Sequence, residues 1–256
     1  GKPASDDPND IRQGNFTSPE TSWSAPGAAP GMSLHMASGI FNGWDDVEGK
    51  TALPGLYCAG DGTYASAIGG ADYDGISGLT TSSCGVQGWC AGESAAAYAQ
   101  TVEAAELPSD TVSALTDEIL APLSVEKGYD PSWVNQQLLN IMSSQTALYL
   151  KSDTSLNAAL SQVEFIRDTC LPKLKAKNPH EVRLCREVVQ KTIACEIKLR
   201  TGLERKESRG MHYRTDYPYR DDNYLGYFSV SKAADCSMNI EFTEVPDEWK
   251  GDLAAD

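Results

Sequence analysis

The residues best suited to chemistry lie near the C-terminal end, where charged side chains recur over a short stretch. They are Arg209, His212, Arg214, Asp216 and Asp221. Guanidinium groups bind carboxylates through paired hydrogen bonds, and a histidine can exchange a proton near neutral pH. The same residue types also form structural ion pairs. Spacing alone therefore leaves two interpretations open, a charged active site and a cluster of structural ion pairs.

A second candidate is rich in glycine. Gly60, Gly62 and Ala65 satisfy the pattern G-x-G-x-x-A directly after the apolar segment 56–59. That pattern is typical of a dinucleotide-binding turn between a strand and a helix. Such a turn needs a helix at once and an acidic residue about 20 residues later. Here a glycine-rich loop continues through Gly70, so we reject a pyrophosphate site in this segment.

The cysteines give no sign of a disulfide framework or of a metal site. Their number is odd, and no C-x-x-C pair, as zinc and iron–sulfur sites usually contain, occurs among them. The seven are Cys58, Cys84, Cys90, Cys170, Cys185, Cys195 and Cys236. His35, His180 and His212 show no spacing that pairs one of them with a cysteine nucleophile. We expect no metal, reduced and mostly structural thiols, and a cytoplasmic location.

Three helices must position the charged stretch, because apolar residues recur at spacings of three and four within 110–208. The three apolar stripes are Val134, Leu138, Ile141, Gln145 and Leu148; Leu156, Ala159, Val163, Ile166 and Cys170; and Val182, Cys185, Val189, Thr192, Cys195, Leu199 and Leu203. Asn178, Pro179 and Glu181 form an N-terminal signal for the third helix. The short connections predict an antiparallel three-helix bundle.

Loops and short strands are expected on both sides of this bundle. Residues 1–54 are rich in Pro, Gly, Ser and Asp. A helix of small residues is expected through 91–99. Gly85, Gly88 and Gly92, before and within this segment, would allow close packing. Short strands are expected at 39–41, 56–59, 227–230 and 239–242.

Composition excludes several classes of protein. The chain has 256 residues and a formal net charge of -15, which argues against nucleic-acid binding because phosphates attract a basic surface. An apolar content of 41% is enough for a packed core. No apolar run reaches the roughly 20 residues of a membrane-spanning helix. The opening residues also lack the apolar centre of a secretion signal.

Two segments together resemble one known family. The first reads P-G-L-Y-C-A-G-D at 54–61, G-A-D-Y-D-G-I-S-G-L at 70–79 and G-x-x-x-G-E-S-A-A at 88–96. The second reads R-K-E-S-R-G-M-H-Y-R-T-D-Y-P-Y-R-D-D at 205–222. Their order, and the helical bundle between them, resemble the fumarate reductase/succinate dehydrogenase flavoprotein family over roughly residues 30–245.

This resemblance implies a fold class of α+β or α/β. Residues 1–108 would be the second flavin-binding segment, the C-terminal part of a Rossmann-like FAD-binding domain. Residues 109–210 would be a helical bundle domain, and 211–256 a C-terminal tail with short strands that packs on the flavin domain. In this family, residues such as Arg209 and Arg214 mostly tie the bundle to the flavin domain, which favours the ion-pair interpretation of the charged stretch.

The implied activity is that of an FAD-dependent oxidoreductase, which transfers hydride between flavin and a substrate, usually across an activated C=C bond. The Asp61 carboxylate could accept hydrogen bonds from the ribityl hydroxyls of the flavin. A helix start near Ser77 would favour the negative charge of a reduced flavin by ~0.3–2 kcal/mol. An ordinary turn aspartate and a plain helix cap are the alternatives. The predicted cofactor-binding residues are Gly60, Asp61, Ser77, Gly78, Leu79 and Thr80.

The predicted catalytic residues, His35 and Tyr73, mark departures from the family. The substrate-binding arginine of its G-A-N-R-L-G turn is Tyr73 here, between Asp72 and Asp74, which would repel a dianion. His35 is an approximate match to a histidine of its H-Y-x-x-G-G segment. Tyr73 could donate a proton or be a packed aromatic ring. These departures argue against fumarate or succinate as the substrate.

Two alternative functions stay open. The turn G-D-G-T-Y-A-S at 60–66 is similar to one in the adenylylsulfate reductase alpha subunit, a relative with the same fold. The loss of the arginine also fits a non-catalytic assembly subunit. In each case we expect a complementing N-terminal half or partner chain with the dinucleotide fingerprint and the capping domain. An iron–sulfur electron-transfer subunit and a small-molecule substrate are further expected partners.

Overall fold

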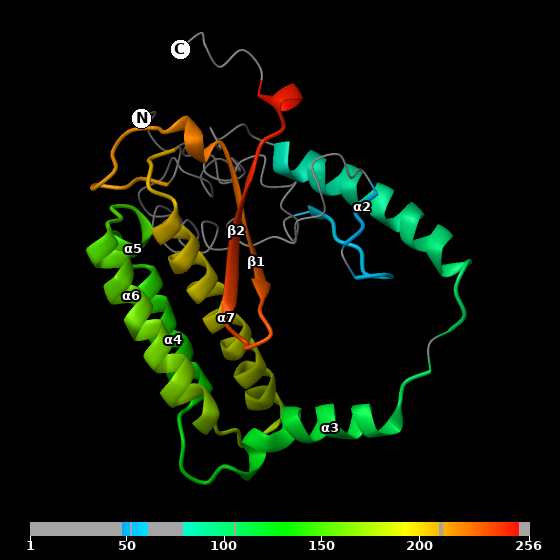
Figure 1. The fold of residues 1–256 in the computed structure, drawn as a ribbon. Helices are drawn as coiled ribbons and strands as arrows, with labels where there is room; N and C mark the ends of the chain where they lie inside the picture. The colour runs from blue at the N-terminus through cyan, green and yellow to red at the C-terminus, as the bar shows by residue number, and fades with distance from the viewer. Residues whose placement is uncertain (1–47, 52, 61–78, 105, 210–211, 251–256) are drawn as a thin grey trace, which may run out of the picture.

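A computed structural model describes residues 48–51, 53–60, 79–104, 106–209 and 212–250, and this part is mostly helical (Figure 1). Its α-helices are α2 Leu79–Ala99, α3 Ser109–Leu120, α4 Pro131–Met142, α5 Gln145–Leu148, α6 Asp153–Phe165 and α7 Pro179–Glu204. Its strands are β1 Gly226–Lys232 and β2 Met238–Glu244. Shorter helical turns occupy Ala121–Ser124, Ile166–Cys170, Leu171–Lys173, Asp222–Tyr224 and Asp247–Trp249.

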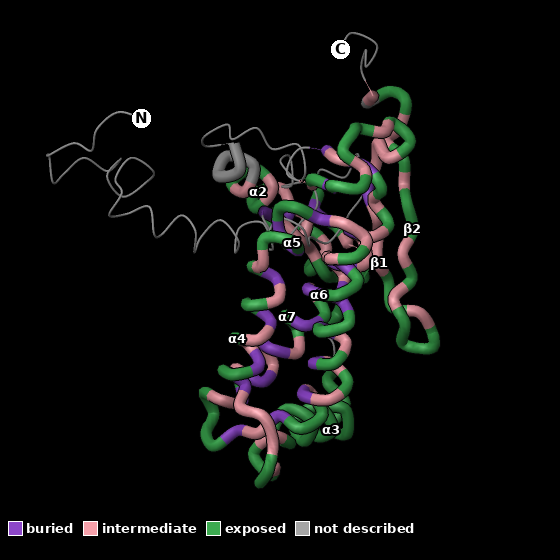
Figure 2. The backbone as a smooth tube through the Cα atoms, turned by 90° about the vertical axis from the view of Figure 1, so that its left-hand side faces the viewer, coloured by how far each residue is buried: buried purple, intermediate pink, exposed green. Residues whose placement is uncertain are grey.

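The predicted three-helix bundle is confirmed. Helices α4, α6 and α7 lie side by side, and their buried residues face one another (Figures 1 and 2). Burial of these apolar side chains is the main force that holds the bundle together. The core consists of Val134, Leu138, Met142, Ala147, Leu156, Ala159, Leu160, Val163, Ile166, Cys170, Leu174, Ala176, Val182, Cys185, Val188, Cys195 and Leu199.

The first predicted helix is wrong in one respect, because it does not run unbroken to Leu148. Helix α4 ends at Met142, and α5 begins after Ser144, whose hydroxyl accepts a hydrogen bond from the Ala147 amide. A serine that caps a new helix competes with continuation of the old one. The phase therefore shifts, so that Gln145 is exposed and Met142 and Ala147 are buried.

The other two helices follow their predicted stripes closely. Helix α6 continues into a π-helical turn that keeps Cys170 in the core. At the start of α7, the Asn178 side chain accepts a hydrogen bond from the Glu181 amide at 3.0 Å, which confirms the cap. The stripe of α7 differs from the prediction at one position. Val188 is buried there, and the predicted Val189 is only partly buried.

The tail forms an antiparallel hairpin of β1 and β2, in which Phe228 pairs with Phe242 and Val230 with Ile240. The two predicted C-terminal strands are thus confirmed. The strand expected at 56–59 is wrong, because this segment makes one isolated bridge, Tyr57 with Lys50, rather than a ladder. The strand expected at 39–41 lies outside the described residues. The β1–β2 pair is the one sheet in the described part of the chain.

Helices α2 and α3 reach away from the bundle and are joined by an extended linker (Figure 1). No residue of α3 is buried, and Figure 2 draws this helix as exposed along its length. In α2, among the side chains described from residue 84 onward, Ala91 alone is buried. None of the helices in the described residues is long and apolar enough to cross a bilayer.

Candidate functional site

The predicted flavin contacts fall at the edge of the described structure. Helix α2 begins at Leu79, as the predicted helix start near 77–80 requires, and Thr80 lies in its first turn. Gly60 is also described. The remaining predicted site residues lie outside the described residues, and their roles stay predictions; they are His35, Asp61, Tyr73, Ser77 and Gly78.

Gly60 shows why the chain needs a glycine at this turn. Its φ of +66° is left-handed, a conformation that costs other residues energy. A β-carbon at this position would lie 3.1 Å from the Cys84 sulfur. The Gly60 amide donates a hydrogen bond to the Gln87 side chain at 3.0 Å. The backbone at Gly60, directly before Asp61, is therefore held against α2 by this hydrogen bond.

The preceding segment is fixed to the same helix by a second glycine. Gly49 has a φ of +70°, and its carbonyl accepts a hydrogen bond from the Cys58 amide at 2.8 Å. A β-carbon on Gly49 would lie 2.8 Å from the Ala91 β-carbon. Sequence reasoning singled out neither Gly49 nor Gln87. A lone glycine before a lysine is too weak a signal to mark a close approach.

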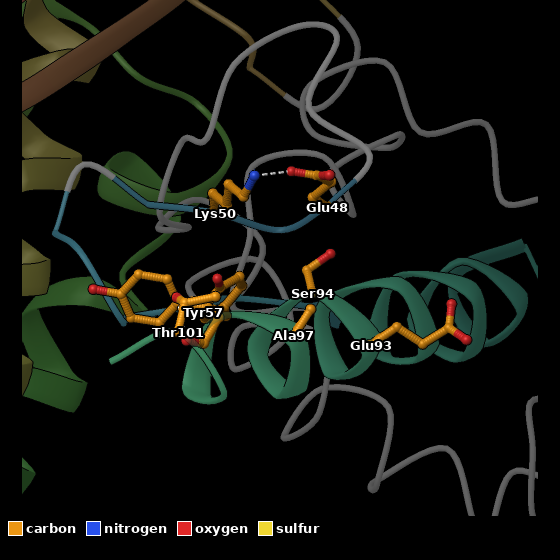
Figure 3. A pocket seen from close by; sticks show the side chains of 8 residues that line it. Glu48, Lys50, Tyr57, Glu93, Ser94, Ala97 and Thr101 are labelled. Atoms are coloured by element: carbon orange, nitrogen blue, oxygen red, sulfur yellow. Dashed lines mark hydrogen bonds and ion pairs between the residues drawn. The ribbon is translucent and has the colours of Figure 1, made fainter. Parts of the chain in front are cut away.

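A surface pocket of about 480 Å³ lies between this segment and the C-terminal half of α2 (Figure 3). Glu48 and Lys50, which form an ion pair, occupy one side, and Tyr57 and Thr101 the other. The pocket contains no histidine or cysteine. Within the described residues, no cluster of His, Cys, Asp and Glu could hold a metal ion. We assign no chemistry to this pocket.

The charged stretch forms a network in which Arg214 is fully buried. Its guanidinium donates to Asp153 at 2.6 Å and to both oxygens of Asp216, at 2.8 and 2.9 Å. It also donates to the carbonyls of Gly202, at 2.7 Å, and Arg205, at 3.1 Å. One side chain of the tail therefore joins the start of α6 to the end of α7. The hydrogen bond from Arg214 holds the pKa of Asp216 far below its usual value.

Glu207 is the centre of a second buried group. Its carboxylate accepts hydrogen bonds from Arg205 at 2.6 Å, from Arg209 at 2.9 and 3.0 Å, and from the Asp221 amide at 2.9 Å. Burial opposes ionisation of Glu207, but the bonds from Arg209, Asp221 and Arg205 together hold its pKa below the usual value. Arg205 in turn donates to the Gly226 carbonyl at the start of β1. The hairpin is thereby joined to the end of α7.

His212 takes part in no ion pair in the described structure. Its Nε2 lies 3.2 Å from the Arg205 carbonyl oxygen. Burial first, and then the positive charge of Lys151, lowers the pKa of His212 to about 4. Burial likewise lowers the pKa of both Lys151 and Lys198 to about 8. A histidine in this setting is neutral at physiological pH.

The ion-pair interpretation is therefore confirmed for Arg209, Arg214 and Asp216. The Asp221 side chain instead caps a short helical turn by accepting a hydrogen bond from the Asn223 amide at 3.0 Å. These groups tie the tail to the bundle, and no described contact ties them to α2. Sequence reasoning did not single out Asp153 as a partner. The position of Glu207, two residues from each of two arginines, was a signal that could have found it.

The three thiols of the bundle, those of Cys170, Cys185 and Cys195, are buried. Burial raises the pKa of each, in the case of Cys195 to about 11. A protonated, buried thiol is a poor nucleophile. The prediction that Cys185 and Cys195 act as small core hydrophobes is confirmed.

The fold of this chain is similar to part of several solved structures. A variant of E. coli quinol fumarate reductase matches with a TM-score of 0.67 and 17% identity, over 81% of this chain and 36% of that one. Mycobacterium smegmatis Sdh1 in complex with UQ1 matches at 0.64 and 22%, over 80% and 35%. Adenylylsulfate reductase from Archaeoglobus fulgidus matches at 0.57 and 23%, over 65% and 29%.

The sequence comparisons show similarity to one family. Residues 135–250 match the family model described as "Fumarate reductase flavoprotein C-term". The chain is also 27% identical over 213 residues to the fumarate reductase flavoprotein subunit of Mycobacterium tuberculosis, in strains H37Rv and CDC 1551. Residues 135–250 are thus similar to the C-terminal region of fumarate reductase flavoproteins. The alignment covers 78% of this chain and 36% of that relative, so the chain spans about a third of its length.

Proposed function

We propose that this chain supplies one side of the FAD site, together with the helical bundle, of an oxidoreductase of the fumarate reductase/succinate dehydrogenase type. The observation that carries the proposal is the family match of residues 135–250, in a chain that aligns with only 36% of a fumarate reductase flavoprotein subunit. The complementing part would bring the dinucleotide fingerprint and the capping domain. We also propose the division into 1–108, 109–210 and 211–256, and a cytoplasmic location.

Helix α2 supports a complementing part. Between residues 84 and 99 it contains one charged residue, Glu93, and its surface is otherwise apolar, small or weakly polar on all sides. A helix of this kind is normally buried. A β-carbon on Gly85, Gly88 or Gly92 would meet no described atom within 4 Å. The close packing that these glycines allow would therefore be made with the complementing part.

Two described features support the proposal of a flavin at this edge. The left-handed Gly60 backbone lies on α2 and leads directly into Asp61, whose carboxylate would accept hydrogen bonds from the ribityl chain. Leu79 and Thr80 at the start of α2, with Ser77 and Gly78 before them in the sequence, would present amide donors to the negative end of the ring system. FAD, when bound, supplies the hydride chemistry. The chain's part is to orient the cofactor and to balance its charge.

The substrate of this site is proposed to be an activated C=C compound, not necessarily fumarate. With Tyr73 in place of an arginine, a bidentate fork for a dicarboxylate is lost, and Asp72 and Asp74 disfavour a dianion. In this proposal Tyr73 donates a hydrogen bond or a proton to the substrate, and His35 faces it. The turn at 60–66 supports adenylylsulfate-reductase-like chemistry as a second candidate. The third is a non-catalytic assembly subunit that retained the fold.

Purification of the native particle through a tag on this chain tests the proposal. We expect absorbance near 450 nm, a property of bound flavin, which is bleached by dithionite and restored by an enoate acceptor. Tyr73→Phe should lower the rate of reoxidation and leave the bound flavin unchanged. Reoxidation by adenylylsulfate but by no enoate would favour the second candidate. A particle without flavin would contradict the proposal and favour the assembly subunit.

A further inference from the structure

Helix α3 has its apolar side exposed. Val112, Leu115, Ile119 and Leu123 follow one another at intervals of three and four residues, which places them along one side of the helix and the turn after it. Their exposed fractions lie between 37% and 51%. A helix on the surface of a complete protein normally turns such a stripe toward the core. We call these four residues the α3 stripe.

The contact between α3 and the bundle is made by a charged residue instead. Glu118 accepts a hydrogen bond from Arg186 of α7 at 2.8 Å. At 100° per residue, Glu118 lies roughly 100° around the helix from the centre of the stripe. This exposed ion pair and the hydrogen bond from the Ala176 amide to the Pro122 carbonyl after α3, at 2.9 Å, join this region to the bundle and leave the stripe uncovered. An apolar surface on the order of a few hundred Å² is the size at which surface patches tend to be interaction sites.

The charges around the stripe limit what can cover it. Residues 109–124 contain Asp110, Asp117 and Glu118, and no lysine or arginine. An anionic lipid surface would be repelled, because membrane-bound amphipathic helices carry basic polar faces. A second copy of this chain would bring its own -15 charge and the same three carboxylates. These charges therefore favour a different protein, with an apolar surface where it meets the stripe.

The length of the relatives indicates where that surface comes from. About two thirds of the M. tuberculosis subunit has no counterpart in the aligned chain. Helix α3 follows α2 through a short linker, and α2 also exposes apolar side chains, Val86 and Trp89. A complementing part that covers α2 would therefore also lie close to α3, because the linker between the two helices is short.

We propose that the α3 stripe is a docking surface for the complementing part of the flavoprotein, the part that carries the dinucleotide fingerprint; this inference rests on the proposed function. The apolar side chains of the stripe insert into an apolar groove of that part, and Asp117, on the opposite side of α3, lies outside this contact. Docking on α3 holds the complementing part at a distance from the cofactor edge. It therefore contributes to assembly without contact to the flavin.

Photo-crosslinking in the native particle tests this docking surface. A photoreactive benzoylphenylalanine at position 115, in the stripe, is compared with one at position 117, on the acidic side. We expect position 115 to give at least tenfold more crosslinked peptide from the fingerprint-bearing part than position 117. Crosslinks from position 115 to a second copy of this chain or to another protein would overturn the proposal, as would equal yields at the two positions.

A pair of variants separates docking from flavin chemistry. With the photoreactive residue at position 112, Leu115→Asp should lower the yield of crosslinked peptide from the fingerprint-bearing part at least tenfold, whereas Asp117→Asn should leave that yield unchanged. Helical content of both variants, measured by circular dichroism, should equal that of the wild type, because no residue of α3 is in the core. An unchanged crosslink yield with Leu115→Asp would overturn the docking surface. Absence of flavin in the wild-type particle would instead contradict the proposed function.

Discussion

Replacement of Glu207 by glutamine tests the structural role of the charged stretch most sharply. The wild-type carboxylate is fully buried and accepts four hydrogen bonds, three of them from Arg205 and Arg209. Glutamine keeps one oxygen but turns an NH₂ group toward a donor, and it removes the nearest counter-charge of the buried Arg209 and the half-buried Arg205. Removal of one partner from a buried ion pair costs ~3–5 kcal/mol. We expect a loss of about 3 kcal/mol of unfolding free energy, because one acceptor remains.

Urea titration followed by far-ultraviolet circular dichroism measures this loss. With a denaturant slope of ~2–3 kcal/mol per molar, the midpoint should fall by about 1 M or more. The matched control is Asp222→Asn, since the Asp222 carboxylate lies 3.9 Å from the same Arg209 but is 75% exposed. The control should change stability by less than about 0.5 kcal/mol. Equal midpoints for the two variants would refute the reasoning, as would a Glu207→Gln particle of normal stability that has lost flavin turnover.

Three further predictions follow from the same geometry. Arg214→Lys should lower the unfolding free energy by about 2–4 kcal/mol, because an ammonium group cannot reach all the acceptors that the buried guanidinium binds. Arg220→Lys, at an exposed position, should leave the unfolding free energy unchanged. Equal urea midpoints for the two variants would contradict this prediction. The pKa of His212 is near 6.5 in the unfolded state but near 4 in the folded state, so the unfolding free energy should fall as pH drops between these values. Urea titrations at pH 7 and pH 4.5, each measured relative to His212→Gln, should give unfolding free energies that differ by about 2–3 kcal/mol. No difference would show that His212 is not buried as neutral imidazole. Gly60→Ala should lower flavin retention by the native particle, because the φ of Gly60 is +66° and the new β-carbon would meet Cys84. By contrast, Gly85→Ala should raise the thermal stability of the separate chain by about 0.5–1 kcal/mol. Unchanged flavin retention in Gly60→Ala would contradict the proposed cofactor edge.

The bundle could be predicted from the sequence because periodicity and burial report the same physical fact. The stripes of α6 and α7 placed Val163 and Leu199 in the core, where both are fully buried. The break after Met142 was missed, because a serine pair is compatible with a helix until one hydroxyl caps a new one. Local competition of this kind is decided by packing and leaves little trace in a pattern.

The partners in the ion-pair network were harder to predict. Arg214 binds Asp153, which lies 61 residues away, and no local pattern encodes a contact across that distance. Gly60 was recognised through its motif, whereas Gln87, which holds its amide, was not. Long-range polar contacts depend on the fold being formed first. The catalytic predictions at His35 and Tyr73 lie outside the described residues and stay predictions.

Native mass spectrometry of the particle, purified through a tag on this chain and paired with flavin analysis, tests the central claim most directly. We predict a mass well above the 27.5 kDa of the chain. That particle should contain the part with the dinucleotide fingerprint, as a partner or within a longer polypeptide, and one FAD for each copy of this chain. A stable 27.5 kDa particle that binds FAD by itself would contradict the account, as would a larger particle without flavin.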